Sequence, residues 1–366
     1  MSIISEYWQR FQVSLFPQLE TVLQEPLTQK LKQFVYILDV VCIHHYVSSP
    51  FSQRMGRKQA DRRSIARAFL AKAVYDLPTT ELLIEMLRLQ PTLRRLCGFE
   101  RLRDIPSAST FSRAFAEFAA AGLGDTVHQA LVAEYVGNKV VMHVSRDATE
   151  VNAREKPVKK EKPEPKPKRK RGRPKKGEVV EPAEPKRLVK QLEQSPEEAI
   201  AELPRDCNIG SKKDSKGHTH SWIGWKAHID WADGGVPLNV LTTSASLHDS
   251  QVAIPMSRIT AQRVTSFYDL MDSAYDAPQI RKVSADLGHV ALIDRNKRGG
   301  EEPIPWEPDR VRRYHERTTA ERGNSRLKDE FGLRHLRVRG HSKAHLHIML
   351  GIMALFADQL RQLLSG

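Results

Sequence analysis

The chain has 366 residues, of which 58 are Lys or Arg and 44 are Asp or Glu, so its formal net charge is +14. This length allows two or three domains, and this charge favours a polyanionic partner without saying which one. The three cysteines lack metal-binding spacing and indicate a reducing compartment, and no apolar run reaches the ~18 residues of a membrane span. The start of the chain is unlike a signal peptide, so we expect a soluble, cytoplasmic protein.

Residues 1–135 have the patterns of helices. The stretch "SIARAFLAKAVYDL" carries apolar residues at helical spacing, and "TTELLIEML" begins with threonines that suit a helix cap. Arginines and lysines are spread along the same stretches. The sequence therefore predicts an all-α N-terminal domain, and it leaves open whether this domain binds DNA or serves only for packing.

The following residues have the pattern of a sheet. "KVVMHVSRDATEV" is β-branched and alternating, which predicts a strand with Asp147 at its C-terminal end. Further strands are expected at "SWIGWKAHIDWA", "VPLNVLTTSAS" and "SFYDLMD", and a shorter one around "HVALIDR". A helix is expected after "HDS", and two long helices are expected at about 310–330 and 342–363. We predict a mixed α/β domain built from residues 136–150 and 213–366.

Residues 151–212 interrupt that domain and are rich in Pro, Lys and Glu, which predicts a disordered insertion. Between Lys156 and Lys176 there are twelve basic and two acidic residues, so this stretch holds +10 of the net charge. Within it, Arg171, Gly172, Arg173 and Pro174 resemble an AT-hook, whose Arg-Gly-Arg core enters the minor groove of A·T-rich DNA. A generic polybasic linker is the alternative.

Three carboxylates on different predicted elements form the candidate catalytic set. Asp147 and Asp272 end predicted strands, and Glu321 lies on a predicted helix. Strand ends meet at one rim of a sheet, and clustered carboxylates need a compensating charge, which suits Mg²⁺ or Mn²⁺. Asp276 competes with Asp272, but we favour Asp272 because it directly follows the apolar run.

The helix with Glu321 carries a regular pattern, since Tyr314, Arg317, Glu321 and Lys328 project within a stripe roughly 60° wide on an ideal helix. A solvated charged face would give the same pattern. The residues and their spacing resemble the DDE transposases of bacterial insertion sequences, in the branch marked by Tyr-x2-Arg-x3-Glu-x6-Lys. "SRDATEV", "HSWIGWKAHI" and "LMDSAYD" are similar to the family's strand blocks, and the helical first third is similar to the domain upstream of such cores.

The resemblance implies a ribonuclease-H-like mixed sheet with flanking helices, in which Asp147, Asp272 and Glu321 hold two Mg²⁺ or Mn²⁺ ions. It implies that Tyr314, Arg317 and Lys328 bind the DNA of the transposon end. The implied enzyme cleaves and joins strands of double-stranded DNA, acts as a homodimer or larger oligomer, and associates with the nucleoid. Two alternatives stay open, namely a ribonuclease-H-like endonuclease without strand transfer and a non-catalytic regulator that binds A·T-rich DNA.

Overall fold

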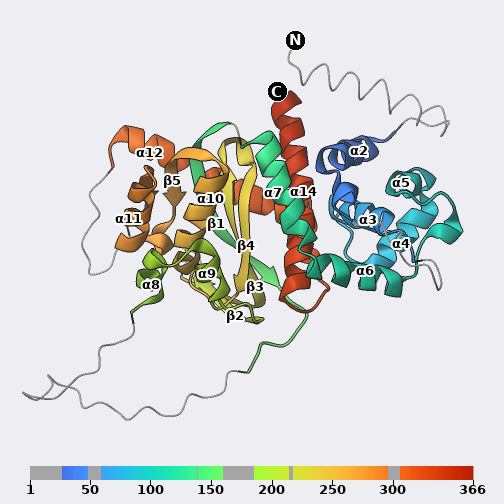
Figure 1. The fold of residues 1–366 in the computed structure, drawn as a ribbon, viewed down its shortest axis with the longest axis horizontal. Coiled ribbons are helices and arrows are strands. Elements are labelled where there is room, and N and C mark those ends of the chain that lie inside the picture. Colours follow the sequence, from blue (N-terminus) through green and yellow to red (C-terminus); the bar gives the residue numbers. More distant parts are fainter. Residues whose placement is uncertain are drawn as a thin grey trace, which may run out of the picture. The chain divides into compact units, whose positions relative to one another are not determined.

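The computed structural model of the protein describes residues 27–47, 59–137, 139–159, 185–213, 217–295 and 306–365. The chain divides into two compact units (Figure 1). The first unit comprises Met1–Leu131, Ser325–Arg337 and His345–Gly366, and the second comprises Val132–Asn324 and Val338–Ala344. No helix in the part of the chain that the structure describes is long and apolar enough to cross a membrane.

The first unit is helical in all its described regular elements. Threonine and aspartate side chains cap its helices as their positions suggest, since Thr28 and Thr79 each accept a backbone N–H three residues on. Aromatic side chains from two helices meet in its core, where Phe69 packs edge-on against Phe111 and Phe115. The helices are α2 (Gln29–Val41), α3 (Arg62–Val74), α4 (Thr80–Leu89), α5 (Pro91–Cys97), α6 (Ala108–Ala120) and α7 (Leu123–Tyr135), of which α7 runs on into the second unit.

The second unit is built on a six-stranded mixed sheet. The strand order is β2-β3-β1-β5-β6, and β4 pairs with β3. β1 is antiparallel to β3 and parallel to β5, and β6 continues the parallel part. The strands are β1 (Val140–Asn152), β2 (Asn208–Lys213), β3 (Thr219–Ala232), β4 (Pro237–Ser244), β5 (Thr265–Met271) and β6 (Val290–Ile293). Apart from β2, these strands lie where the sequence pattern predicts them.

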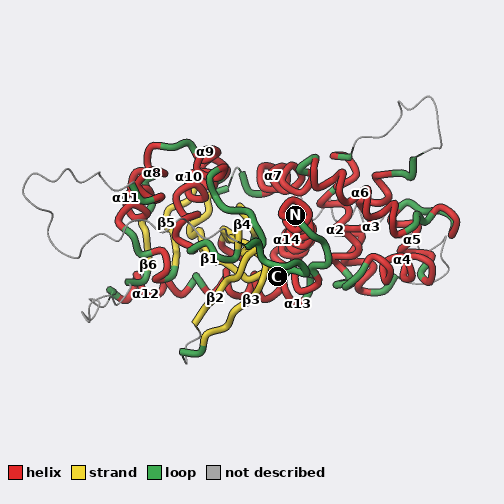
Figure 2. The backbone as a smooth tube through the Cα atoms, turned by 90° about the horizontal axis from the view of Figure 1, so that it is seen from below, coloured by secondary structure: helices red, strands yellow, loops and turns green. Residues whose placement is uncertain are grey.

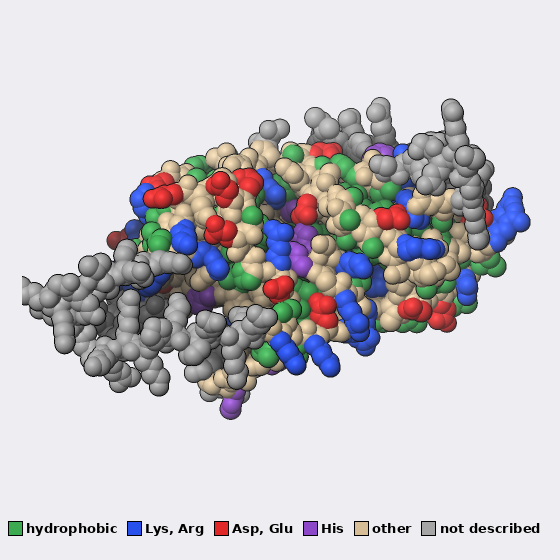
Figure 3. All heavy atoms as spheres, turned by 60° about the horizontal axis from the view of Figure 1, so that its bottom comes forward, with side chains coloured by type: hydrophobic (Ala, Val, Ile, Leu, Met, Phe, Trp, Pro, Cys, Tyr) green, Lys and Arg blue, Asp and Glu red, His purple; other side chains and the backbone are tan. Residues whose placement is uncertain are grey.

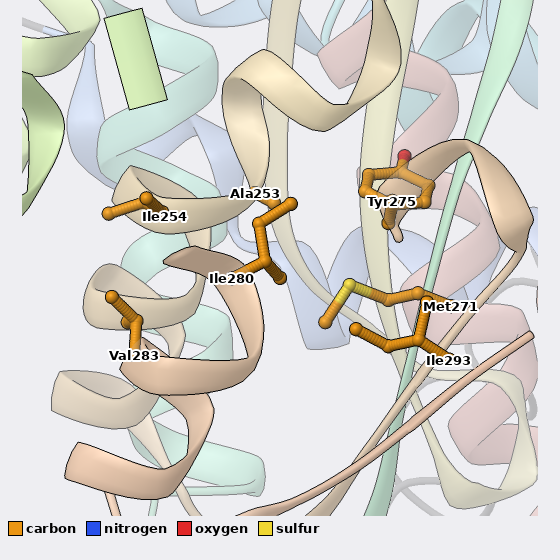
Figure 4. Close-up of a cluster of buried hydrophobic side chains, with 7 residues drawn as sticks. All are labelled: Ala253, Ile254, Met271, Tyr275, Ile280, Val283 and Ile293. Carbon is orange, nitrogen blue, oxygen red and sulfur yellow. The ribbon is translucent and has the colours of Figure 1, made fainter. Parts of the chain in front are cut away.

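Helices cover both faces of this sheet. Figure 2 shows α8, α9, α10 and α11 on one side of the strands and α12 on the other. Apolar side chains of α10, α11, β5, β6 and the turn after β5 form one buried cluster, drawn in Figure 4. The helices are α8 (Arg187–Glu193), α9 (Pro196–Ala201), α10 (Ala253–Arg263), α11 (Pro278–Asp286), α12 (Pro308–His315), α13 (Thr318–Asp329) and α14 (His341–Ser365), of which α13 and α14 continue into the first unit.

An ion pair between adjacent strands β1 and β3 lies in the core of the second unit. The guanidinium of Arg146 donates to both carboxylate oxygens of Asp230, over 2.7 and 2.9 Å, and both side chains are buried. The third guanidinium nitrogen donates to the carbonyl of Ala253 and the hydroxyl of Ser257 on α10. Because every charged atom has a partner, this pair fixes α10 against the sheet at the residue that precedes Asp147.

The end of the predicted insertion is regular, which differs from the expectation of disorder over 151–212. α8 and α9 precede β2 there, and a capping box joins Ser195 to Glu198 at the start of α9. Leu188 and Leu192 pack against the apolar cluster of Figure 4, and Arg258 donates to the last carbonyls of α8. Tertiary contacts therefore stabilise two short helices whose average composition alone does not suggest them.

The predicted helix at about 310–330 is interrupted. α12 ends at His315 and α13 begins at Thr318, and between them backbone bonds join Arg317 to Tyr314 and Ala320 to Arg317 at three-residue spacing. Two threonines with low helix propensity follow this tighter turn. Tyr314 and Glu321 therefore lie on different helices, and not on the single helix that the sequence predicts.

Candidate active site

Asp147 lies within β1, not at its end. The strand continues to Asn152 because β3 accompanies it that far, with Asp147 opposite Ile229. The parallel pairing with β5 stops earlier, at the pair Ser145 and Leu270. If that register is continued for two residues, Asp147 falls opposite Asp272, so the two aspartates follow the end of the same parallel pair.

Asp272 is the first residue after β5. Its side chain accepts the backbone N–H of Ala274 at 2.9 Å and so caps the short turn after the strand. Its competitor Asp276 instead accepts from Arg281 at 2.9 Å, and Arg281 also donates to the carbonyl of Ile293. The structure thus gives Asp276 a role in attaching α11, whereas the charges of Arg317 and Lys212 lower the pKa of Asp272 as they lower that of Asp147.

Arg317 connects the three carboxylates electrostatically. Its guanidinium is 2.6 Å from Oε1 of Glu321 and 5.8 Å from the ring centroid of Tyr314. Burial lowers the pKa of Arg317, but the nearby acidic groups more than offset this effect and raise it above its ordinary value. These groups are Tyr314, Asp147, Glu321 and Asp272. Tyr314 and Glu321 therefore both contact Arg317, although the helix break separates them in secondary structure.

Asn324 is a polar neighbour of Asp147 that the sequence reasoning did not identify. Its Nδ2 donates to Oδ2 of Asp147 at 3.0 Å. The side chain is buried, and its Oδ1 has no hydrogen-bond partner. The sequence feature that could have identified Asn324 is its position three residues after Glu321. This spacing places both side chains near one face of α13.

Burial makes the two aspartates hard to ionise. It raises the pKa of Asp147 to about 6, and the charge of Asp272 adds to this effect, while Lys212, the amide of Ala148 and Arg317 oppose it. Burial likewise raises the pKa of Asp272, where the charge of Asp249 acts in the same direction. Such a pair favours a cation beside it, because a positive charge would restore both carboxylates to the ionised form.

We expect a pH-dependent gain in stability from Asp147→Asn in the metal-free protein. Since the pKa of Asp147 is higher in the folded than in the unfolded state, wild-type stability falls as pH rises from about 4 to about 6 and stays reduced above that. Asparagine removes this cost, so the variant should exceed the wild type in melting temperature at pH 7.5 and match it near pH 4. An equal difference at both pH values would contradict the raised pKa.

The described residues contain no group of three or more His, Cys, Asp or Glu side chains arranged to hold a metal ion. Glu321 is paired with Arg317 in this structure. The donor set nevertheless fits a hard cation, since Asp147 and Asp272 supply carboxylate oxygens and the buried Oδ1 of Asn324 has no partner among the protein groups.

The structure does not place two parts of the predicted site relative to these carboxylates. Lys328 is near the end of α13 and belongs to the first unit. Arg171, Gly172, Arg173 and Pro174 lie outside the described residues. The DNA-binding roles of these residues stay predictions.

Two stretches of the chain match known protein families. Residues 143–357 match the family described as "Transposase DDE domain", and residues 21–117 match the family described as "Transposase domain (DUF772)". The first match covers more than half of the chain and spans Asp147, Asp272 and Glu321. No curated protein and no solved structure gave a significant match.

Proposed function

Because the chain belongs to the family of DDE transposase domains, we propose that it cleaves DNA at the ends of an insertion sequence and joins those ends to target DNA. The observation that carries this proposal is that Asp147 and Asp272 follow the end of the same pair of parallel strands, and that α13, which carries Glu321, contacts Asp147 through Asn324. A set of three carboxylates suits phosphoryl transfer, in which bound metal ions stabilise the charge of the reacting phosphate. We propose these three residues as the catalytic set.

Divalent metal ions are general to this family, and we propose that Asp147, Asp272 and Glu321 hold two Mg²⁺ or Mn²⁺ ions. When bound, such ions activate the attacking water or hydroxyl and stabilise the leaving oxygen. Glu321 would have to exchange its ion pair with Arg317 for the cation. Arg317 would then be free to bind a phosphate of the DNA, and Tyr314, next to it, offers an aromatic face for an unpaired base.

The mixed sheet supports a ribonuclease-H-like core for the second unit. The antiparallel strands β4, β3 and β1 are followed across the sheet by the parallel strands β5 and β6, with helices on both faces. In this arrangement Asp147 lies on the central strand β1, and Asp272 follows the end of its parallel neighbour β5, which supports their proposed roles.

The proposed partner is double-stranded DNA, bound by a homodimer or larger oligomer. On the face drawn in Figure 3, Lys and Arg side chains are interspersed with Asp and Glu. The strongest concentration of positive charge in the sequence is the stretch from Lys156 to Lys176. We therefore propose that this stretch supplies much of the non-specific attraction to DNA.

The test of the proposed function is a reaction of the full chain with its element's end DNA, target DNA and Mg²⁺, followed by separation of the products. Nicked ends together with joined strands would support the transposase. Nicks without joined strands would favour the endonuclease, and binding without either product would favour the non-catalytic regulator.

A substitution at Lys328 tests whether it binds phosphate. Lys328→Ala should weaken binding of end DNA and lower the slope of log affinity against log salt by about 1, because one phosphate contact and its counterion release are lost. The measurement is a binding titration at several salt concentrations. Lys282→Ala is the control, since this exposed lysine pairs with Asp286 on α11, and equal behaviour of both variants would assign Lys328 to a solvated surface.

The AT-hook is tested by exchanging Arg171 and Arg173 for lysine in the full chain. Lysine keeps the charge but lacks the flat guanidinium that enters a narrow minor groove, so the preference for A·T-rich over G·C-rich duplex should be lost. The measurement is a competition titration with the two duplexes at fixed salt. The double variant Lys175→Arg with Lys176→Arg is the control, because it also keeps the charge of the stretch but leaves Arg171 and Arg173 in place. It should keep the preference for A·T-rich duplex. A wild-type chain without any preference would mean that the stretch is a polybasic linker.

A further inference from the structure

Asn324 is the only neutral side chain for which the structure gives a hydrogen bond to the carboxylate of Asp147 within the described residues. The bond joins Nδ2 to Oδ2 over 3.0 Å and spans 177 positions of sequence, from α13 to β1. The exposed fraction of Asn324 is 7%. A neutral donor at this position can orient the carboxylate without changing the net charge of the site, whereas Arg317 acts on Asp147 through its positive charge.

The residue before Asn324 explains how the asparagine reaches the strand. A Cβ atom built on Gly323 would lie 2.6 Å from ring atoms of Trp231, so only glycine lets the backbone of α13 come this close to β3. Trp231 is buried and pairs with Ser145 of β1, two residues before Asp147. Close packing of helix and sheet therefore sets the length of the bond from Asn324 to Asp147.

The other end of the amide points to a ligand. Oδ1 of Asn324 is buried and has no partner among the protein groups, although a buried acceptor without a partner costs free energy. The unpartnered atom belongs to the same planar group whose Nδ2 contacts Asp147, so it lies within a few ångströms of the carboxylate. A water molecule bound to a cation held by Asp147 would supply the missing donor.

From this geometry we propose that Asn324 is a positioning residue of the active site. Its Nδ2 fixes the orientation of the Asp147 carboxylate, and its Oδ1 accepts a hydrogen bond from a water of the bound cation. The inference rests on the proposed function, because it requires Asp147 to be a metal ligand. A purely structural asparagine would only join α13 to β1, and its loss would lower stability without a specific effect on cation binding.

The experiment is a titration of the full chain with Mn²⁺ alone. Binding is measured from the electron paramagnetic resonance signal of the Mn²⁺ that stays free. Asn324→Ala should raise the dissociation constant for Mn²⁺ roughly 10–100-fold, as expected for loss of a group that orients a ligand. Asn239→Ala is the matched control, because Asn239 is also a buried asparagine of the second unit and donates to Thr260 and the carbonyl of Met256. Its melting temperature should fall while its Mn²⁺ affinity stays within twofold of the wild type.

Three outcomes separate the inference from the function on which it rests. Equal Mn²⁺ affinities of Asn324→Ala and the wild type would overturn the positioning role, provided that Asp147→Ala abolishes binding. A wild type that does not bind Mn²⁺, or that binds it equally after Asp147→Ala, would overturn the proposed metal site and with it the positioning role. If Asn324→Ala does not fold, Asn324→Ser keeps a small polar group there, and its affinity should lie between those of the alanine variant and the wild type.

Discussion

Replacement of Asp147, Asp272 or Glu321 by alanine is expected to lower the rate of strand cleavage by roughly 10³-fold or more while leaving DNA binding largely intact. The reason is that each substitution removes an oxygen ligand from the proposed metal site but no group that binds DNA phosphates. Cleavage is measured with end DNA and Mg²⁺, and affinity is measured on the same DNA in the absence of metal.

The chain offers a matched control for Asp272. Asp276 is four residues away and is also a partly buried aspartate, but it pairs with Arg281, which keeps a second bond to the carbonyl of Ile293. Asp276→Ala should therefore leave cleavage close to the wild-type rate. Loss of cleavage in Asp276→Ala together with full activity in Asp272→Ala would show that the second carboxylate has been assigned to the wrong residue.

Replacement of Asp230 by alanine is expected to lower the free energy of unfolding of the second unit by about 3–5 kcal/mol. It would leave the guanidinium of Arg146 buried without its counter-charge, and the exposed fraction of that arginine is 1%. Unfolding in urea can be followed by tryptophan fluorescence, because three of the five tryptophans lie on β3.

Two further variants isolate the cause of this loss. Asp286→Ala removes an ion pair of similar length with Lys282, but both partners are more than half exposed, so the expected cost is below about 1 kcal/mol. The double variant Arg146→Met with Asp230→Leu removes both buried charges and should recover part of the stability that Asp230→Ala loses. If Asp230→Ala costs no more than Asp286→Ala, the buried pair does not contribute to stability as proposed.

The sequence predicted most strands of the sheet because their alternation and β-branched residues are local signals. It also predicted Asp272 as the residue that ends an apolar run, and β5 does stop one residue before it. The position of Asp147 within β1 was not predictable in this way, because the strand is prolonged by its pairing with β3. Strand length here depends on a partner that is far away in the sequence.

Other differences arise from packing that no local pattern reports. The bond from Asn324 to Asp147 depends on how α13 lies on the sheet. The capping box of Ser195 and Glu198 is a local helix signal that the sequence contains. The lysines and prolines around it dominated the composition of the stretch, which predicted disorder instead. The roles of Tyr314, Arg317 and Lys328 in DNA binding depend on a partner and remain predictions.

Neighbouring residues of β1 point to opposite faces of the sheet, and this alternation couples correct folding to the assembly of the active site. Arg146 reaches α10 on one face, and Asp147 reaches Asn324 of α13 on the other. A slip of β1 by one residue would exchange them, leaving a carboxylate against the carbonyl of Ala253 and a guanidinium at the proposed metal site. Both misplaced charges would lose their partners in the same step, so misregistered chains would be unstable as well as inactive. The sheet therefore disfavours chains that fold with the candidate site incorrectly assembled.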